Sequence, residues 1–292
     1  MSAAAIHTTK SSRPSTPHIG GRTVSSWTQL RVLVARILRQ NFTNADTMIT
    51  VVAMPVFMLL FFVYVIGGNI ALGTAETAGA AGTNGGTALS YVEYSLPGFL
   101  LIAMTMGSAY TAVRINMDKS KGFLARLQSL PIRRWVILGS HVVASVVFML
   151  VAEVAVLIVG LVIGYRPHMG AAQVALFGVI SVLFAFAITL LAVPFSLKAK
   201  DYASASGFSY VLLMLLFVSS ALMPTAGMAA PVRAFAKYQP MTPIVEYVRS
   251  LLDTGYAAPD WAAAASFGWL AALIIVFGAF SYKRYLSVFG GK

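Results

Sequence analysis

The sequence predicts an all-α integral membrane protein with six membrane-spanning helices. Of its 292 residues, 58% are hydrophobic and only 10% are charged, and the mean hydropathy is +0.79. A soluble domain carries about 25% charged residues, so most of this chain is expected to lie in a lipid bilayer. Six apolar runs reach the roughly 20 residues that cross a hydrocarbon core of about 30 Å. Little length is left for a large soluble domain.

The N-terminal part is predicted to lie in the cytoplasm and on the membrane surface. Residues 1–24 are rich in Ser, Thr, Pro and Gly and predict a disordered cytoplasmic tail. Residues 25–43 predict an amphipathic interfacial helix, whose apolar arc is formed by Trp27, Leu30, Val34, Ile37 and Leu38. Its arginines would face lipid phosphates. The alternative is the first half of a small soluble helix pair, for which the following sequence leaves little length.

The six spans are predicted near residues 48–66, 95–113, 136–164, 174–195, 205–223 and 261–282. Their orientation follows from the basic residues. All of the 21 lysines and arginines fall on one side of the membrane except Arg166, Arg233, Lys237 and Arg249. The side rich in basic residues is the cytoplasmic one, so both termini are expected there. This asymmetry accounts for the net charge of +12, and no nucleic-acid partner is expected.

The sequence gives no sign of a catalytic, cofactor-binding or metal site. It has no cysteine, and its four histidines are too far apart to show a metal-ligand spacing. The phosphate-binding pattern Gly-x-x-x-x-Gly-Lys-Ser/Thr is absent, and Gly291-Lys292 is the one Gly-Lys pair. Any energy from ATP would therefore have to come from another chain.

A basic stretch, Asn116–Trp135, separates the second and third spans. Within it a short helix is predicted from Gly122 to Leu130, and Pro131 would end it. Its apolar face is formed by Phe123, Leu124, Leu127 and Leu130, which recur at the three- and four-residue steps of one helix face. The surrounding charges are Lys119, Lys121, Arg126, Arg133 and Arg134. This face would be offered to a partner in the cytoplasm, or the helix would simply lie on the lipid headgroups.

The region between the fifth and sixth spans, residues 224–258, predicts two half-helices. Pro224, Pro231, Pro240 and Pro243 exclude one continuous helix. Pro231 and Pro243 suit the first turns of two short helices. We expect these helices to form an extracellular re-entrant pair, with an ordinary extracellular loop carrying interfacial helices as the alternative.

Several side chains are candidates for a substrate path or a gate. Glu153 lies inside the third span, where a carboxylate is energetically costly, and both a structural hydrogen bond and a cargo or gating role stay open. Adaptable or aromatic side chains suited to an amphipathic cargo occur in the first, second and fifth spans. More often such residues face lipid or neighbouring helices. They are Met54, Phe57, Phe61, Tyr110, Phe208 and Phe217.

The motifs resemble a known family. Lys-Gly-Phe-Leu-Ala-Arg-Leu-Gln-Ser-Leu-Pro-Ile-Arg-Arg, residues 121–134, resembles the cytoplasmic coupling helix of type 2 ATP-binding-cassette (ABC-2) exporter permeases, and especially of daunorubicin-resistance-type drug permeases. The interfacial helix, the six spans and Pro-Met-Thr-Pro-Ile-Val-Glu-Tyr-Val-Arg-Ser-Leu-Leu, residues 240–252, agree with it. The resemblance covers nearly all of the chain from Trp27 onward. One departure is Gln239, where many members have Asn.

The resemblance implies a half-transporter in which residues 25–292 form an ABC-2 transmembrane domain with the type V exporter fold. Two permease copies, a homodimer or a pair with a paralogue, would rest their coupling helices, residues 119–131, on two copies of a separate ATPase subunit that holds ATP and Mg. The chain would export an amphipathic or hydrophobic, drug-like or lipid-like compound across a prokaryotic cell membrane. The ATPase-coupling residues would be Lys121, Gly122, Phe123, Leu124, Arg126, Leu127, Leu130, Pro131 and Arg133.

Three other readings stay open. An ion-coupled carrier would usually show internal repeats and several buried ionisable residues, whereas the sequence has one clear case, Glu153, and no repeat. A membrane-embedded enzyme would need a nucleophile–base or metal constellation in the spans, which is not found. Within the exporter class, a lipid or polysaccharide precursor competes with a drug as the cargo.

Overall fold

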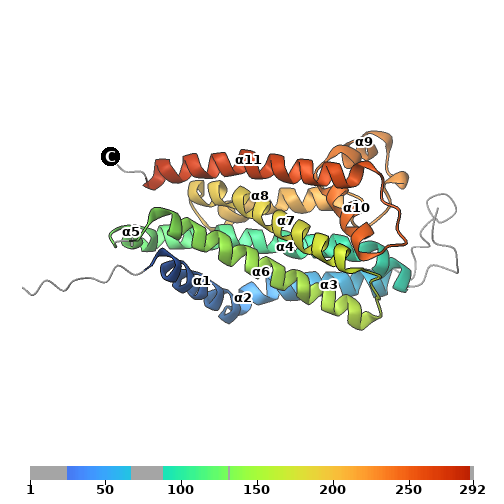
Figure 1. Ribbon diagram of the computed structural model, residues 1–292, viewed down its shortest axis with the longest axis horizontal. Helices are drawn as coiled ribbons and strands as arrows, with labels where there is room; N and C mark the ends of the chain where they lie inside the picture. The colour runs from blue at the N-terminus through green and yellow to red at the C-terminus, as the bar shows by residue number, and fades with distance from the viewer. Residues whose placement is uncertain (1–24, 67–87, 131, 290–292) are drawn as a thin grey trace, which may run out of the picture.

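The computed structural model describes residues 25–66, 88–130 and 132–289, so the tail predicted to be disordered, residues 1–24, lies outside the described part. The described part consists of helices joined by turns and short irregular segments, and its β-type pairing is an isolated bridge between His168 and Asp253. It forms an elongated bundle (Figure 1). We call its two ends the α5 end, where α5 lies with the start of α1 and the end of α11, and the α10 end, where α9 and α10 lie.

The chain enters the bundle through α1 (Ser26–Thr43) and a first span that is not a uniform α-helix. Ser25 Oγ accepts a hydrogen bond from the backbone N–H of Trp27 at 3.2 Å and caps α1. The span comprises α2 (Ala45–Met48), the π-helical turn η1 (Ile49–Ala53), α3 (Met54–Phe61) and a second π-helical turn, η2 (Phe62–Ile66). Pro55 lacks an N–H and crowds the preceding turn, which explains the wider turn before it.

Among the described residues, five helical stretches are long and apolar enough to cross a membrane: the run Ala45–Val65, α4 (Ala88–Ser120), α6 (Arg134–Ile163), α7 (Ala171–Lys198) and α11 (Trp261–Phe289). The fifth predicted span, residues 205–223, differs, because its helix, α8 (Tyr202–Phe217), has only 16 residues. Just after α8, side-chain hydrogen bonds of Ser219 replace the helical backbone pattern. The Ser219 hydroxyl donates to the carbonyl of Leu216 at 2.6 Å and accepts from the N–H of Ala221 at 3.0 Å.

Helix α4 lies at the centre of the bundle and contacts α3, α6, α7, α8 and α10. It begins at Ala88 rather than near residue 95 as predicted, and its first turns are buried at Tyr91 and Val92. The Tyr91 hydroxyl donates to the carbonyl of Leu222 at 3.2 Å. Gly98 allows the turn after α8 to approach, because a Cβ atom there would lie 2.6 Å from the Ala221 carbonyl oxygen.

At the α10 end the proline-rich region contains η3 (Thr225–Gly227), α9 (Ala230–Tyr238) and α10 (Met241–Leu252). Pro231 and Pro243 lie in the first turns of α9 and α10, which confirms that prediction. Pro224 and Pro240 occupy the positions just before η3 and α10. Helix α9 is largely exposed, whereas α10 is buried along most of its length.

Arg249 of α10 was counted among the extracellular charges, but the structure buries it, with 2% of its surface exposed. Its Nη1 pairs with Glu246 Oε1 at 3.0 Å, its Nη2 donates to the Ser220 carbonyl at 2.8 Å, and its Nε donates to the Tyr94 carbonyl at 3.1 Å. Burial alone would lower the pKa of Arg249, yet Tyr94, Glu246 and Tyr256 together raise it. The guanidinium therefore stays charged and joins α4, α10 and the turn after α8.

Candidate functional site

The candidate site is the turn and short helix that join α4 to α6. Helix α4 ends at Ser120, and Gly122 follows with a φ of 68°, a left-handed conformation that glycine adopts without a steric penalty. Helix α5 (Phe123–Gln128) is shorter than the predicted helix of residues 122–130. Its predicted terminator, Pro131, lies outside the described residues. Arg133 is extended and precedes the first residue of α6.

The inner face of α5 packs within the chain. Leu124 and Leu127 are 4% and 7% exposed. They form one cluster with Leu30, Leu33, Val136 and Ile137 of α1 and α6. This differs from the expectation of a continuous apolar face for a separate protein, because the apolar arc of α1 already covers half of it. Leu124 and Leu127 position α5, and they are not available for a direct contact with another chain.

The outer face of α5 and its flanks stays accessible. Leu130 is 52% exposed, and Lys121, Arg126 and Arg133 are exposed. Phe123 is half-buried beneath the guanidinium of Arg36, which lies 3.8 Å from its ring centroid. The surface that a second protein could contact is thus one leucine framed by three basic side chains.

Behind this surface a partly buried polar cluster joins three helices. Asp118 Oδ2 of α4 lies 3.5 Å from Arg36 Nη1 of α1 and 3.6 Å from His141 Nε2 of α6. The sequence analysis did not single out Asp118 or His141. The sequence did contain one indication that Asp118 pairs with a basic residue, because Asp118 is the only acidic residue in the basic stretch 116–135.

The end of α4 also holds the end of α7. Asn116 Nδ2 donates to the carbonyls of Ser196 and Ala199 at 3.2 and 2.9 Å, and Lys119 Nζ donates to the carbonyl of Leu197 at 2.6 Å. The last carbonyls of a helix have no partner within it, so these contacts satisfy them. The segment that carries α5 is therefore tied to α1, α6 and α7.

The candidate cargo residues do not gather at one place. Met54, Phe57, Phe61 and Phe217 are exposed, whereas Phe208 is buried and stacks on Phe195 with ring centroids 5.4 Å apart. The Tyr110 hydroxyl donates to Asp46 Oδ2 at 2.7 Å. None of them lines the cavity that lies beside α5, between α1 and α4. Their role in a substrate path stays a prediction.

Glu153 of α6 is buried, and its Oε1 accepts a hydrogen bond from Ser181 Oγ of α7 at 2.8 Å. This contact supplies the structural hydrogen bond that the sequence analysis left open. A gating role stays a prediction.

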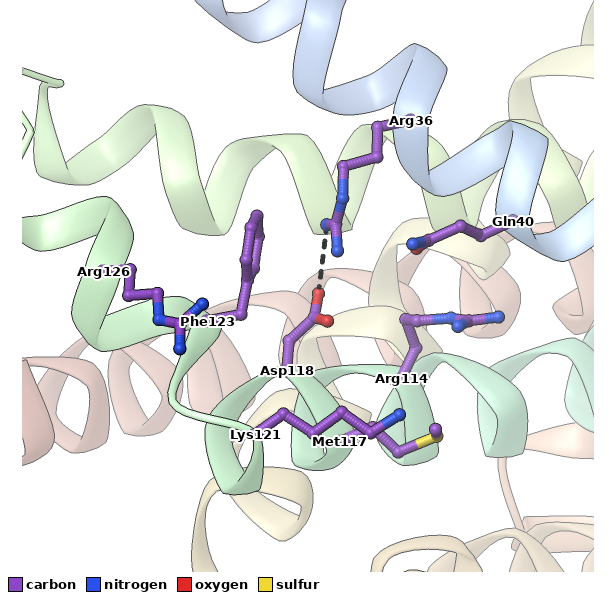
Figure 2. A pocket seen from close by; sticks show the side chains of 8 residues that line it. All are labelled: Arg36, Gln40, Arg114, Met117, Asp118, Lys121, Phe123 and Arg126. Carbon is purple, nitrogen blue, oxygen red and sulfur yellow. Dashed lines mark hydrogen bonds and ion pairs between the residues drawn. The ribbon is translucent and has the colours of Figure 1, made fainter.

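A cavity of about 270 Å³ lies beside α5 (Figure 2). Side chains of α1, α4 and α5 surround it, and most of them are polar or charged. Its lining residues are Arg36, Gln40, Arg114, Met117, Asp118, Lys121, Phe123 and Arg126.

Comparison with known proteins identifies the family. The family model of ABC-2 type transporters matches residues 28–252. The daunorubicin resistance ABC transporter permease protein DrrB1 of Streptomyces coeruleorubidus is 27% identical over 206 residues, 70% of this chain and 68% of the relative. The probable doxorubicin resistance ABC transporter permease protein DrrC of Mycobacterium tuberculosis is 26% identical over 234 residues, 77% of this chain and 79% of the relative. The chain therefore belongs to the ABC-2 type transporter family and is a multi-pass membrane permease of an ABC transporter.

Proposed function

We propose that this permease forms the membrane path of an ATP-driven exporter for an amphipathic or hydrophobic, drug-like or lipid-like compound. The family match and the drug-resistance names of its relatives support this. ABC permeases work with an ATPase subunit, and the absence of a phosphate-binding motif in this sequence agrees with that. In the proposal, two permease copies form a homodimer, two ATPase subunits bind ATP and Mg, both termini are cytoplasmic, and α9 and α10 form the extracellular re-entrant pair.

The accessible face of α5 carries the proposed coupling role. Leu130 would enter an apolar groove of the ATPase, while Lys121, Arg126 and Arg133 would meet acidic side chains at its rim. Leu124 and Leu127 hold α5 against α1 and α6 from behind. A displacement of the ATPase would therefore move α5 together with these helices, and switch the bundle between two packed arrangements.

The coupling contact is tested by purifying the tagged full-length chain together with its ATPase subunit in mild detergent. In the proposal, the two elute together and hydrolyse ATP. Leu130→Asp should lower the recovered ATPase about tenfold, a loss of about 1.4 kcal/mol, because it places a charge in an apolar contact.

The matched control is Val232→Asp, which changes a residue of α9 that is 42% exposed at the α10 end. It should leave the recovered ATPase unchanged. Equal recovery of the ATPase with wild type and Leu130→Asp would refute the contact.

The cargo is tested in an efflux-deficient bacterium that produces the permease and its ATPase. Accumulation of daunorubicin should fall when both subunits are present, and should not fall with an ATPase that cannot hydrolyse ATP. Unchanged accumulation would remove daunorubicin and favour a lipid or polysaccharide precursor. Export that persists without the ATPase would instead indicate an ion-coupled carrier.

A further inference from the structure

We propose that the cavity between α1, α4 and α5 binds the phosphate group of an anionic phospholipid. The cavity is the space shown in Figure 2, with a volume of about 270 Å³. One water occupies about 30 Å³ in the liquid, so the space admits a phosphate group with a polar headgroup substituent. This site goes beyond the proposed export function and does not depend on which compound is exported, but it shares Lys121 and Arg126 with the proposed coupling surface.

The charges around the cavity favour an anion. Its lining includes the cationic side chains Arg36, Arg114, Lys121 and Arg126 and one carboxylate, that of Asp118. Arg36 comes from α1, Arg114 and Asp118 come from α4, and Lys121 and Arg126 come from the turn and the short helix that follow α4, and together they line one space (Figure 2). Like charges held together are unfavourable unless an anion lies between them. Guanidinium groups match phosphate oxygens with two parallel hydrogen bonds, and an ammonium group adds a point charge.

Most of this positive charge is not neutralised within the protein. Arg36 is paired with Asp118, at 3.5 Å. Arg114 Nη2 donates to Asn41 Oδ1 at 3.2 Å, and this partner is a neutral amide. The side chains of Lys121 and Arg126 make no hydrogen bond or ion pair within residues 25–66, 88–130 and 132–289. Their donors are free for an external oxyanion.

Gln40 gives an independent indication of a ligand. It lines the cavity, and its Oε1 atom is buried with no hydrogen-bond partner among the described residues. A buried acceptor without a donor is costly, by about 1–3 kcal/mol. A headgroup that bears a hydroxyl would supply this donor while its phosphate meets the cations. A glycerol headgroup has both features, which makes phosphatidylglycerol the probe of choice.

The neighbouring surface favours a lipid over a soluble phosphate. Trp27, in the first turn of α1, is 67% exposed, and Trp135, in the first turn of α6, is 51% exposed. Both helices begin at the α5 end of the bundle (Figure 1). Exposed tryptophans concentrate at membrane–water interfaces, where headgroup phosphates also lie. Helix α1 therefore brings the cavity to the level of the headgroups, and acyl chains could extend along the apolar surface of the bundle.

The test is native mass spectrometry of the purified full-length chain with phosphatidylglycerol or phosphatidylcholine of the same acyl chains. The wild-type protein should retain more phosphatidylglycerol than phosphatidylcholine. The double variant Lys121→Gln with Arg126→Gln should weaken retention about 30-fold, from about a fivefold effect for each basic residue near an anionic lipid. Both positions are exposed and unpaired, so the fold should be unaffected. The matched control is Arg233→Gln with Lys237→Gln, which removes the same charge from exposed positions of α9, outside the cavity.

Retention by the control and loss by the cavity variant would support the site. Equal losses in both variants, or no preference for phosphatidylglycerol, would overturn it. Displacement of the lipid by an equal concentration of inorganic phosphate would assign the cavity to a soluble anion and refute the lipid. If the cavity variant retains the lipid as wild type does but no longer binds the ATPase, the cavity binds an acidic surface of that subunit. This result also refutes the lipid. None of these lipid readouts depends on transport, so failure of the export proposal would be seen separately.

Discussion

At the scale of single residues, the buried pair of Glu246 and Arg249 shows how charge holds an irregular region in place. Helices α9 and α10 are short, and prolines interrupt the chain around them. Arg249 compensates by binding two carbonyls outside its own helix, those of Tyr94 and Ser220. Its guanidinium also lies 3.9 Å from the centroid of the Tyr94 ring. One side chain thus connects the central helix to the turn after α8.

We predict that Arg249→Met destabilises the protein by about 3–5 kcal/mol, because it leaves the Glu246 carboxylate buried without its cation. The double variant with Glu246→Met should be less destabilised than Arg249→Met alone, since the second change removes the stranded charge. Denaturant unfolding in detergent measures both. If the two effects simply add, Arg249 and Glu246 are not energetically coupled.

The spacing of Glu246 and Arg249 was visible in the sequence, but their burial was not. An i, i+3 pair of opposite charges is equally typical of an exposed helix surface. Arg249 therefore counted as an extracellular charge. Asp118 and His141 escaped notice for a related reason, because their contact joins α4 to α6 and depends on how the helices pack. A histidine far from other ligands gives no sequence signal for such a contact.

At the scale of elements, α5 illustrates what periodicity can and cannot predict. The spacing of its leucines correctly indicated a helix with an apolar face. It could not tell whether that face is covered by another chain or by α1, which lies about 90 residues earlier in the sequence. The π-helical turns of the first span were not predictable either, since hydropathy is the same for an α-helix and a π-helix. The placement of Pro231 and Pro243 was predictable, because proline fits few helical positions.

We predict that Leu127→Ala loosens α5, whereas Leu130→Ala does not. Leu127 is 7% exposed within the cluster, and truncating a buried leucine costs about 2–5 kcal/mol. Leu130 is 52% exposed, and a change there should stay within about 0.5 kcal/mol. Hydrogen–deuterium exchange of α5 amides should become faster in Leu127→Ala only. Equal exchange in the two variants would contradict the packing of α5 on α1.

At the scale of the whole molecule, composition predicted the membrane class and the order of the helices, but not which helix is central. Within the most apolar stretch of each helix, 83% of the α4 residues are buried in the protein, against 22% for the first span and 11% for α11. Hydropathy ranks these helices differently, because it measures transfer into lipid and not contact with protein. The exposed faces of α11 and the first span are free for lipid or for a second permease copy.

The orientation of the bundle is the last prediction, and the chain suits a direct test because it contains no cysteine. Ser129 is exposed at the α5 end, and Tyr238 is 72% exposed at the α10 end. The basic residues around α5 should hold that end in the cytoplasm. A membrane-impermeant maleimide should therefore label Tyr238→Cys in intact cells, and Ser129→Cys only after permeabilisation. Ser287→Cys, near the end of α11, is the control and should behave like Ser129→Cys. The opposite pattern would place the α5 end outside the cell, where no ATP is available to an ATPase bound there, and would refute both the orientation and the coupling surface.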